Sequence, residues 1–226
     1  MKATDYTVIR SRRRSLELRL YPDRRIEVRV PLRTSEREIG DFVASKSAWL
    51  QNRLQGLEQR PAPVPLQYCQ GETHLFLGQR YPLALSRAAR PHTALQSGSL
   101  CLLTPEPDNP ARIASQLDRW YRQQADGVFN QMIDRHFPFF AGRGHKRPQL
   151  RVRTMKSRWG SLSSRGYINL NLELIKAPLE SIEYVVLHEL CHLEHMNHGV
   201  GFHALLSQCL PDWQARKRAL NGTPLR

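Results

Sequence analysis

Residues 181–196 read SIEYVVLHELCHLEHM, and the HELCH segment at residues 188–192 decides how the fold is interpreted. Histidines four positions apart lie on one face of a helix, about 6 Å apart at Cβ, so His188 and His192 can share one metal ion. Glu189 lies beside them and can take a proton from an attacking water. Apolar residues at helical spacing predict a half-buried helix from about residue 178. We therefore expect a zinc site here rather than a surface helix with incidental histidines.

The sequence leaves more than one candidate for a third metal ligand, which a catalytic zinc site requires. On a straight helix, His195 would lie about 10.5 Å along the axis from His188, too far to close on the same ion. His198 stands between Asn197 and Gly199, residue types that end helices through a left-handed cap, so the chain can turn back there. We predict His198 as the third ligand, in the spacing H-E-x-x-H-x-x-x-x-x-H.

Three further residues are also possible ligands by residue type. His203 lies on an expected short helix and is also a candidate for a group beside the substrate or behind the ligands. Asp212 is the only acidic residue after Glu194, and its place before a helical run favours a helix N-cap. Cys191 lies about 60° off the direction of His188 around the helix and is interpreted as a small buried apolar residue.

The composition resembles that of an ordinary soluble protein, with 40% hydrophobic and 24% charged residues among 226. No segment approaches the roughly 20 apolar residues of a membrane span, and the first residues lack a secretory signal. The four cysteines show no C-x-x-C pairing, which fits a reducing compartment; they are Cys69, Cys101, Cys191 and Cys209. We therefore expect a cytoplasmic protein with no membrane association.

The net charge of +14 is unevenly distributed. Residues 1–150 carry 24 Lys and Arg against 14 Asp and Glu, a balance of +10, whereas residues 151–226 carry ten against six, a balance of +4. The densest runs are Arg10–Arg14, Arg24–Arg25 and Arg143–Arg147. A basic excess favours nucleic acid, nucleotide phosphates or acidic surfaces as partners, and it predicts polyanion binding through the N-terminal region. The alternative is an arginine-rich surface without a specific partner.

The pattern along the chain predicts an α+β fold with a β-rich N-terminal arm. Alternation over residues 14–31 predicts a β-hairpin with a turn near Pro22 and Asp23. Thr34 or Ser35 is expected to start one helix that reaches Leu54, with Glu38 placed for a capping box. A linker is expected at residues 60–65. Three short strands are expected after it, at residues 73–77, 81–86 and 100–103.

The second half predicts the order helix, strand, strand, metal-binding helix, which matches a minimal zincin-like core with a small antiparallel sheet. The helix is expected at residues 110–136 and the two strands at residues 150–155 and 167–172. The turn-rich loop between the strands is expected at residues 156–165. The free edge of the second strand can pair with an extended substrate, although an ordinary hairpin strand is the alternative. We expect two domains, a β-rich region with one helix over residues 1–105 and the metallohydrolase core over residues 106–226.

Three segments resemble the YgjP-like zinc metallopeptidase-domain family, minimal zincins similar in core to SprT-type and WLM-type proteases. They read RWGSLSSRGYINLNL at 158–172, APLESIEYVVLHELCHL at 177–193 and NHGVGF at 197–202. The resemblance is strong over residues 150–222. It implies zinc on the positions of His188, His192 and His198, with Glu189 as the catalytic carboxylate. Two departures from the family pattern are Leu162, where the family often has Cys, and His203, where it often has Trp.

Three functions fit these features. The first is a zinc-dependent metallopeptidase with Glu189 as the general base and a polypeptide substrate. The second is a nucleoside triphosphate pyrophosphatase acting on a phosphate-bearing small molecule, with arginines neutralising the phosphates, although no P-loop and no acidic cluster for magnesium are found. The third is a nucleic-acid-associated protein with a nearby zinc site. We expect the first, with Zn²⁺ as cofactor.

Overall fold

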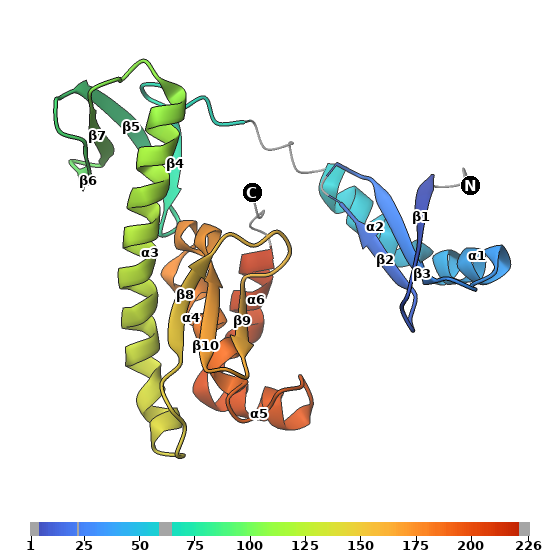
Figure 1. Cartoon of the computed structure of the whole chain (residues 1–226). Coiled ribbons are helices and arrows are strands. Elements are labelled where there is room, and N and C mark those ends of the chain that lie inside the picture. Colours follow the sequence, from blue (N-terminus) through green and yellow to red (C-terminus); the bar gives the residue numbers. More distant parts are fainter. Residues whose placement is uncertain (1–4, 22, 59–64, 222–226) are drawn as a thin grey trace. The chain divides into compact units, whose positions relative to one another are not determined.

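The structure, a computed structural model, describes residues 5–21, 23–58 and 65–221 and divides into two units, Met1–Pro65 and Leu66–Arg226. The first unit has one sheet and the second has two, and each unit is described by itself (Figure 1). Pro22 of the expected turn and residues 60–64 of the expected linker lie outside the described residues. No helix in the described part of the chain is both long enough and apolar enough to span a bilayer.

The first unit contains a three-stranded sheet in the order β1-β3-β2. The expected hairpin is present, because β2 and β3 pair antiparallel, and β1, which the sequence did not indicate, pairs with β3 in parallel. Val28 and Val30 of β3 pack against Ile39 in a small core. The elements are β1 (Tyr6–Ser11), β2 (Glu17–Leu20), β3 (Ile26–Pro31), α1 (Glu36–Ser45) and α2 (Ser47–Glu58).

The predicted capping box begins α1. Glu38 Oε2 accepts from the Ser35 N–H at 2.8 Å, and the Glu38 N–H donates to Ser35 Oγ at 3.3 Å. The expected single helix to Leu54 is instead two helices, because Lys46 leaves helical geometry with φ −102° and ψ 5°. A new helix then starts at Ser47.

The second unit opens with a four-stranded sheet in the order β4-β5-β7-β6. Three of its strands lie where short strands were expected, and β6 was missed. β5 and β7 pair in parallel, while β6 pairs antiparallel with β7. The elements are β4 (Thr73–Phe76), β5 (Gln79–Arg87), β6 (His92–Gln96) and β7 (Ser99–Thr104).

This sheet packs onto the remainder of the second unit. Tyr121 Oη donates to the Leu75 carbonyl at 2.7 Å, and the Leu77 N–H donates to the Ile175 carbonyl at 2.9 Å. Gly78 has φ +80°, and a Cβ there would lie 2.9 Å from Pro178, so this close approach requires glycine. The contacts therefore divide the chain at 65/66, because residues 66–105 share the core of the second unit. The expected functional division, with the metallohydrolase core beginning at residue 106, stays a prediction.

The rest of the second unit follows the expected order of helix, strands and metal-binding helix. Its long helix passes Pro138, where it was expected to stop, because Phe140 beyond the proline is fully buried and holds the last turn in place. The elements are α3 (Pro110–Ala141), β8 (Gln149–Arg153), β9 (Gly160–Ser163), β10 (Tyr167–Asn171), a 3₁₀ helix η1 (Leu172–Lys176), α4 (Leu179–Cys191), α5 (Val200–Cys209) and α6 (Trp213–Asn221).

The second sheet is mixed, which corrects the expected antiparallel sheet. β10 pairs in parallel with β8, placing Tyr167 opposite Gln149, and antiparallel with β9, placing Tyr167 opposite Ser163. β10 is therefore the central strand, and the substrate pairing expected at its free edge is wrong. β9 lies at an edge of the sheet, within the segment predicted to be a turn-rich loop.

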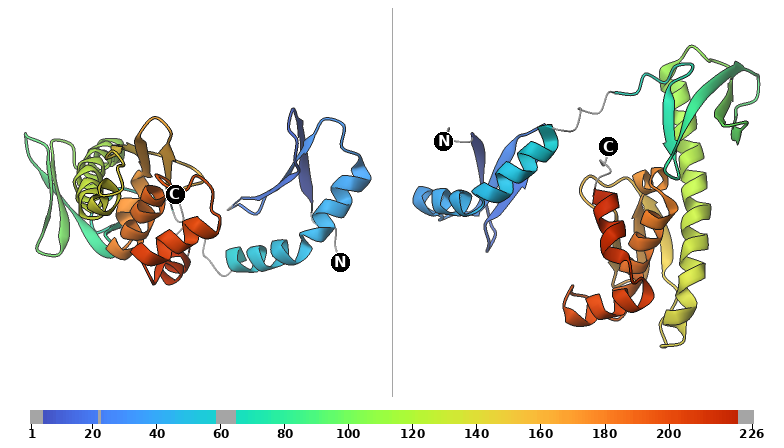
Figure 2. Two further views of the ribbon diagram at one scale, coloured as in Figure 1. Left: turned by 90° about the horizontal axis from the view of Figure 1, so that it is seen from below. Right: turned by 180° about the vertical axis from the view of Figure 1, so that it is seen from behind.

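α4 lies at the centre of this unit and contacts α3, α5, α6, β9 and β10. Ile168 and Leu170 of β10 are fully buried in the core that α3 and α4 share. In Figure 2, α3 lies beside this layer in both views, seen along its axis on the left and along its length on the right. The fold is thus α+β with a β-rich N-terminal arm, and it places the C-terminal end of α4 beside β9.

Asn171, which is fully buried, holds the loop between β8 and β9 in place. Its Nδ2 donates to the Met155 carbonyl at 2.7 Å and to the Arg158 carbonyl at 3.0 Å. Asn171→Ala is expected to lower the free energy of unfolding by about 1–3 kcal/mol, because the two loop carbonyls lose the donor that the buried side chain provides. Urea denaturation measures the change, with Gln123→Ala on the exposed face of α3 as control, expected within about 0.5 kcal/mol of the parent. Equal losses in both variants would contradict this role.

Candidate metal centre

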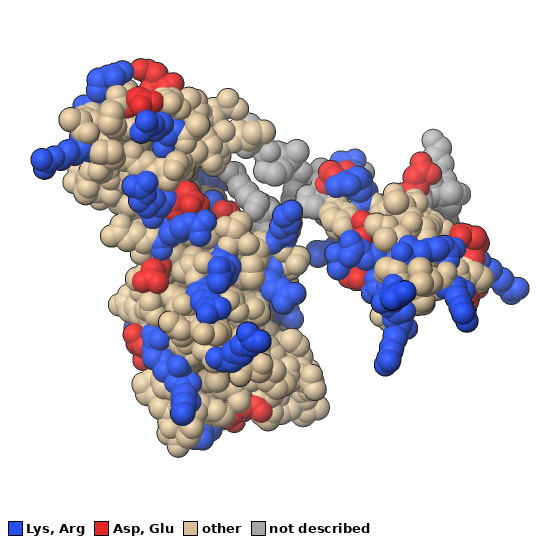
Figure 3. Space-filling model, in the orientation of Figure 1, with Lys and Arg blue, Asp and Glu red and all other residues tan. Residues whose placement is uncertain are grey.

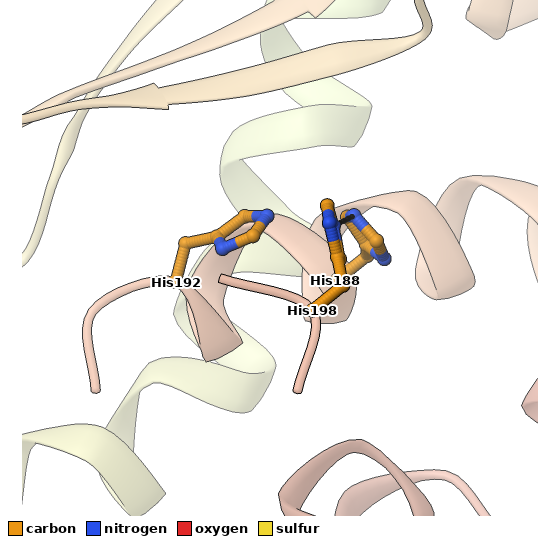
Figure 4. Close-up of side chains that lie close together, drawn as sticks. All are labelled: His188, His192 and His198. Carbon is orange, nitrogen blue, oxygen red and sulfur yellow. Dashed lines mark hydrogen bonds between the residues drawn. The ribbon is translucent and has the colours of Figure 1, made fainter. Parts of the chain in front are cut away.

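Three imidazoles meet at the C-terminal end of α4 (Figure 4). His188 lies in the last turn of α4, His192 caps it, and His198 comes from the segment before α5. One ring nitrogen from each lies within 4.8 Å of the others, and the Nε2 atoms of His188 and His198 are 3.0 Å apart. The structure therefore brings together the three histidines that the sequence indicated as ligands.

His198 reaches this cluster by a different path from the one predicted. α4 ends at Cys191, and the N–H groups of Glu194 and His195 both bond to the Cys191 carbonyl, so the chain tightens directly after the helix. Gly199 has φ −81° and caps the start of α5, and Asn197 is not left-handed either. The expected left-handed cap at Asn197–Gly199 is therefore wrong, and the turn lies earlier.

His195 contributes to the cluster through its backbone, while its ring lies outside it. His192 Nδ1 lies 2.9 Å from the His195 carbonyl oxygen, which can only accept, so Nδ1 carries the proton. This tautomer leaves Nε2 of His192 with its lone pair available to a metal. The ring of His195 lies against Gly201, where an added Cβ would be 2.9 Å from its Cε1. The sequence could not indicate this contact of the His195 carbonyl, because a main-chain contact does not depend on residue type.

The other residues weighed as ligands lie outside the cluster. The ring of His203 stacks on Trp213, with centroids 5.3 Å apart and planes 12° apart. Asp212 immediately precedes α6, and its carboxylate pairs with Arg216 Nε at 2.9 Å. Cys191 is fully buried, in agreement with its interpretation as an apolar residue.

The ring of Phe202 packs against all three histidines. The sequence did not indicate this role. The side chain of Phe202 is buried, and its ring centroid lies 4.9 Å from that of His188 and 4.7 Å from those of His192 and His198. An apolar residue in the first turn of the helix that follows His198 was the available signal. The contact orients the imidazoles and excludes water from one side of them.

Glu189 lies buried between α4 and β9, with 4% of its surface exposed. Burial raises the pKa of its carboxyl group to about 8, against the opposing effects of a hydrogen bond from the Leu162 backbone and the charge of Arg158. Gly160 makes room for this side chain, because a Cβ there would lie 2.7 Å from Glu189 Oε1 and 2.8 Å from Cγ. The carboxyl group is thus held against β9.

Burial favours the neutral form of His188 and His198. Burial lowers the pKa of His188 to about 3, with further lowering by His192 and His198. The pKa of His198 is lowered by burial and then by His192. Burial and the nearby Glu189 raise the pKa of Tyr184 to about 12, so its hydroxyl keeps its proton. Neutral imidazole is the form that binds metals.

The donor set fits zinc. In a tetrahedral site with Zn–N bonds of 2.0–2.1 Å, two ligand nitrogens lie about 3.3 Å apart. The Nε2 atoms of His188 and His198 are 3.0 Å apart, close to this value. Three protein nitrogens also leave one coordination position open, as catalytic zinc sites do.

Gly160→Ala is expected to displace the Glu189 side chain and to destabilise the protein by about 1–3 kcal/mol, because the added methyl group overlaps a buried carboxyl group. A thermal melt and an activity assay measure the two effects together. Gly127→Ala in α3 is the matched control, since a Cβ there meets nothing within 4 Å. The control is expected to be neutral or to gain about 0.5–1 kcal/mol from its helical position. A Gly160→Ala variant as stable as this control would show that the close contact is relieved easily.

An α+β unit that gathers three histidines beside a buried carboxyl group defines a metallohydrolase. The family profile described as YgjP-like, metallopeptidase domain, matches residues 14–223, so the chain belongs to this metallopeptidase family, as its resemblance implied. Among solved structures, the chain is similar to the metallopeptidase zymogen jannalysin of Methanocaldococcus jannaschii. The identity is 18%, the match covers 41% of this chain and 93% of that one, and the TM-score is 0.36. No curated protein matches the chain.

Proposed function

We propose that this protein is a zinc-dependent peptidase in which His188, His192 and His198 hold the metal and Glu189 is the general base. The observation that carries the proposal is the meeting of three imidazoles at the C-terminal end of the helix that also carries a buried carboxyl group. A bound zinc ion would supply Lewis acidity toward the carbonyl group of the scissile bond.

The protein's own groups divide the remaining work. Glu189 would accept the proton of the attacking water and then pass it to the leaving amine. Gly160 and the Leu162 backbone hold its carboxyl group in place, while Phe202 keeps water from the inner side of the histidines. The carbonyl of His195 keeps the ring of His192 in one orientation.

A polypeptide substrate is favoured by the edge position of β9. Among the described residues, this strand pairs with β10 alone, so the main-chain groups of its other edge that do not bond to Glu189 can accept an extended peptide through hydrogen bonds. Met196 and Val200, which are 65% and 90% exposed, flank His198 and offer apolar contacts for substrate side chains. We also propose a reducing, cytoplasmic location, which the four free cysteines support.

The proposal is tested by incubating purified, zinc-loaded protein in parallel with an unfolded polypeptide and with nucleoside triphosphates. We expect cleavage of the polypeptide that stops when a chelator removes the zinc, and no pyrophosphate release. Pyrophosphate release with an intact polypeptide would replace the peptidase with a phosphoanhydride hydrolase. If zinc-loaded protein attacks neither substrate, the assignment as a hydrolase is contradicted.

A further inference from the structure

A long basic segment of the second unit has no role in the site described above. The 38 residues from 135 to 172 contain nine Lys and Arg and no Asp or Glu. Figure 3 shows Lys and Arg side chains over the part of the surface formed by β8, β9 and β10. The nine residues are Arg135, Arg143, Lys146, Arg147, Arg151, Arg153, Lys156, Arg158 and Arg165.

The pleat of the β8-β10-β9 sheet concentrates polar groups on its outer face. Ile168 and Leu170 of β10 face the core, so Asn169 between them points outward. Tyr167, two residues before Asn169, points the same way. The register sets Asn169 opposite Arg151 of β8 and opposite Ser161 of β9. The outer face therefore carries an arginine row beside a row of hydroxyl, amide and aromatic groups.

A cavity of about 360 Å³ opens on this face and is lined by Arg151, Ser163, Arg165, Tyr167 and Asn169. The guanidinium carbon of Arg151 lies 3.3 Å from the centroid of the Tyr167 ring. Such a stack holds the guanidinium flat, while its in-plane N–H groups and its outer face remain available to a ligand. The lining contains no carboxylate.

The arginines of this face are not neutralised within the second unit. Among its described residues, 66–221, no carboxylate forms an ion pair with Arg151, Arg153 or Arg165. Arg147, away from the outer face of the sheet, instead pairs with Asp134 at 2.6 Å. Unpaired guanidinium groups next to hydroxyl groups are well suited to phosphate oxygens.

We propose that the outer face of the β8-β10-β9 sheet binds single-stranded nucleic acid. Arg151, Arg153 and Arg165 pair with backbone phosphates, and the stack of Tyr167 and Arg151 offers a planar surface to a base. An acidic polypeptide would use the charges alone. The aromatic stack and the amide oxygen of Asn169 favour the nucleic acid, because bases present both flat faces and hydrogen-bonding edges.

This face adjoins the histidine site through β9. The Cβ direction of Gly160 faces Glu189 and the side chain of Leu162 packs against the core, so the intervening Ser161 and the following Ser163 face outward. A nucleic acid on the outer face would therefore lie across a single strand from the candidate metal centre. The inference is independent of the proposed peptidase reaction, because binding is measured without turnover.

The test uses the full chain and a fluorescein-labelled oligothymidylate of about 20 nucleotides, longer than the site of one single-strand-binding fold. Fluorescence anisotropy gives the affinity at several salt concentrations. The triple variant Arg151→Ala, Arg153→Ala, Arg165→Ala is expected to bind at least about tenfold more weakly. The slope of log K against log salt is expected to fall by about 2, because each phosphate contact on a single strand contributes about 0.7.

The control variant removes three exposed arginines from another sheet of the same unit, with Arg80→Ala, Arg87→Ala and Arg90→Ala on and after β5. It loses the same charge and is expected to weaken binding less than about threefold, with little change in slope. Tyr167→Leu is expected to weaken binding several-fold at an unchanged slope, because it removes stacking and keeps the charge. Thermal melts establish that each variant is folded.

Two outcomes overturn the proposal. If both triple variants lose affinity equally, the binding reflects net charge alone. If polyglutamate displaces the oligonucleotide at lower concentrations than unlabelled oligothymidylate does, the face is a site for acidic polypeptides instead.

Discussion

Glu189→Gln is expected to lower the rate of hydrolysis by about 10²–10⁴-fold while the metal stays bound. The amide has nearly the same shape as the carboxyl group and still fits against Gly160 and the Leu162 backbone, but it cannot accept a proton. Rates are measured on the polypeptide substrate, and zinc content is measured by atomic emission on the same samples.

Glu180→Gln is the matched control, because Glu180 is exposed at the start of the same helix and far from its catalytic end. It is expected to retain parental activity and zinc. If Glu189→Gln loses its zinc instead, Glu189 is a ligand and not a base. If it keeps both zinc and full activity, another group moves the proton.

His198→Ala is expected to weaken zinc binding by more than about 100-fold, since even groups behind the ligands contribute about 10–100-fold. The expectation rests on the position of His198 Nε2, which lies 3.0 Å from His188 Nε2. His195→Ala is expected to leave zinc affinity within a few-fold of the parent, because the backbone carbonyl that orients His192 remains.

Competition with a coloured zinc chelator ranks these two variants, and circular dichroism shows whether they fold. The pair forms a matched comparison, since both remove an imidazole from the same segment after α4. If His195→Ala releases zinc more readily than His198→Ala, the ring of His195 is a ligand. The third-ligand assignment and its spacing would then have to be abandoned.

The local parts of the site could be predicted from the sequence because they depend on helix geometry alone. The spacing of His188 and His192 places them on one face of α4, and the apolar residues at helical spacing along the helix bury the opposite face. The capping box at Ser35 is a comparable local signal, and the structure contains it. The roles of these groups as ligands and base stay predictions.

Long-range features could not be predicted in the same way. The parallel pairing of β8 with β10 depends on which strands meet, and no residue type records that choice. β9 has only four residues, too few for alternation to stand out from a loop. The turn after Cys191 is formed by main-chain hydrogen bonds, which do not depend on residue type. The prediction relied on Asn197 and Gly199 and therefore placed the turn too late in the chain.

The contact between Gly160 and Glu189 gives β9 two functions at once. The strand is four residues long and is held by a neighbour on one side only, which makes it among the least secured elements of its sheet. The same strand positions the carboxyl group of Glu189. An extended peptide that pairs with the open edge would give the strand a partner on both sides. It would thereby hold the proposed base, Glu189, in position while the scissile bond lies in the site. If the proposed function holds, a long substrate would complete the site at which it is cleaved, whereas a fragment too short to pair with β9 would leave the proposed base less well placed.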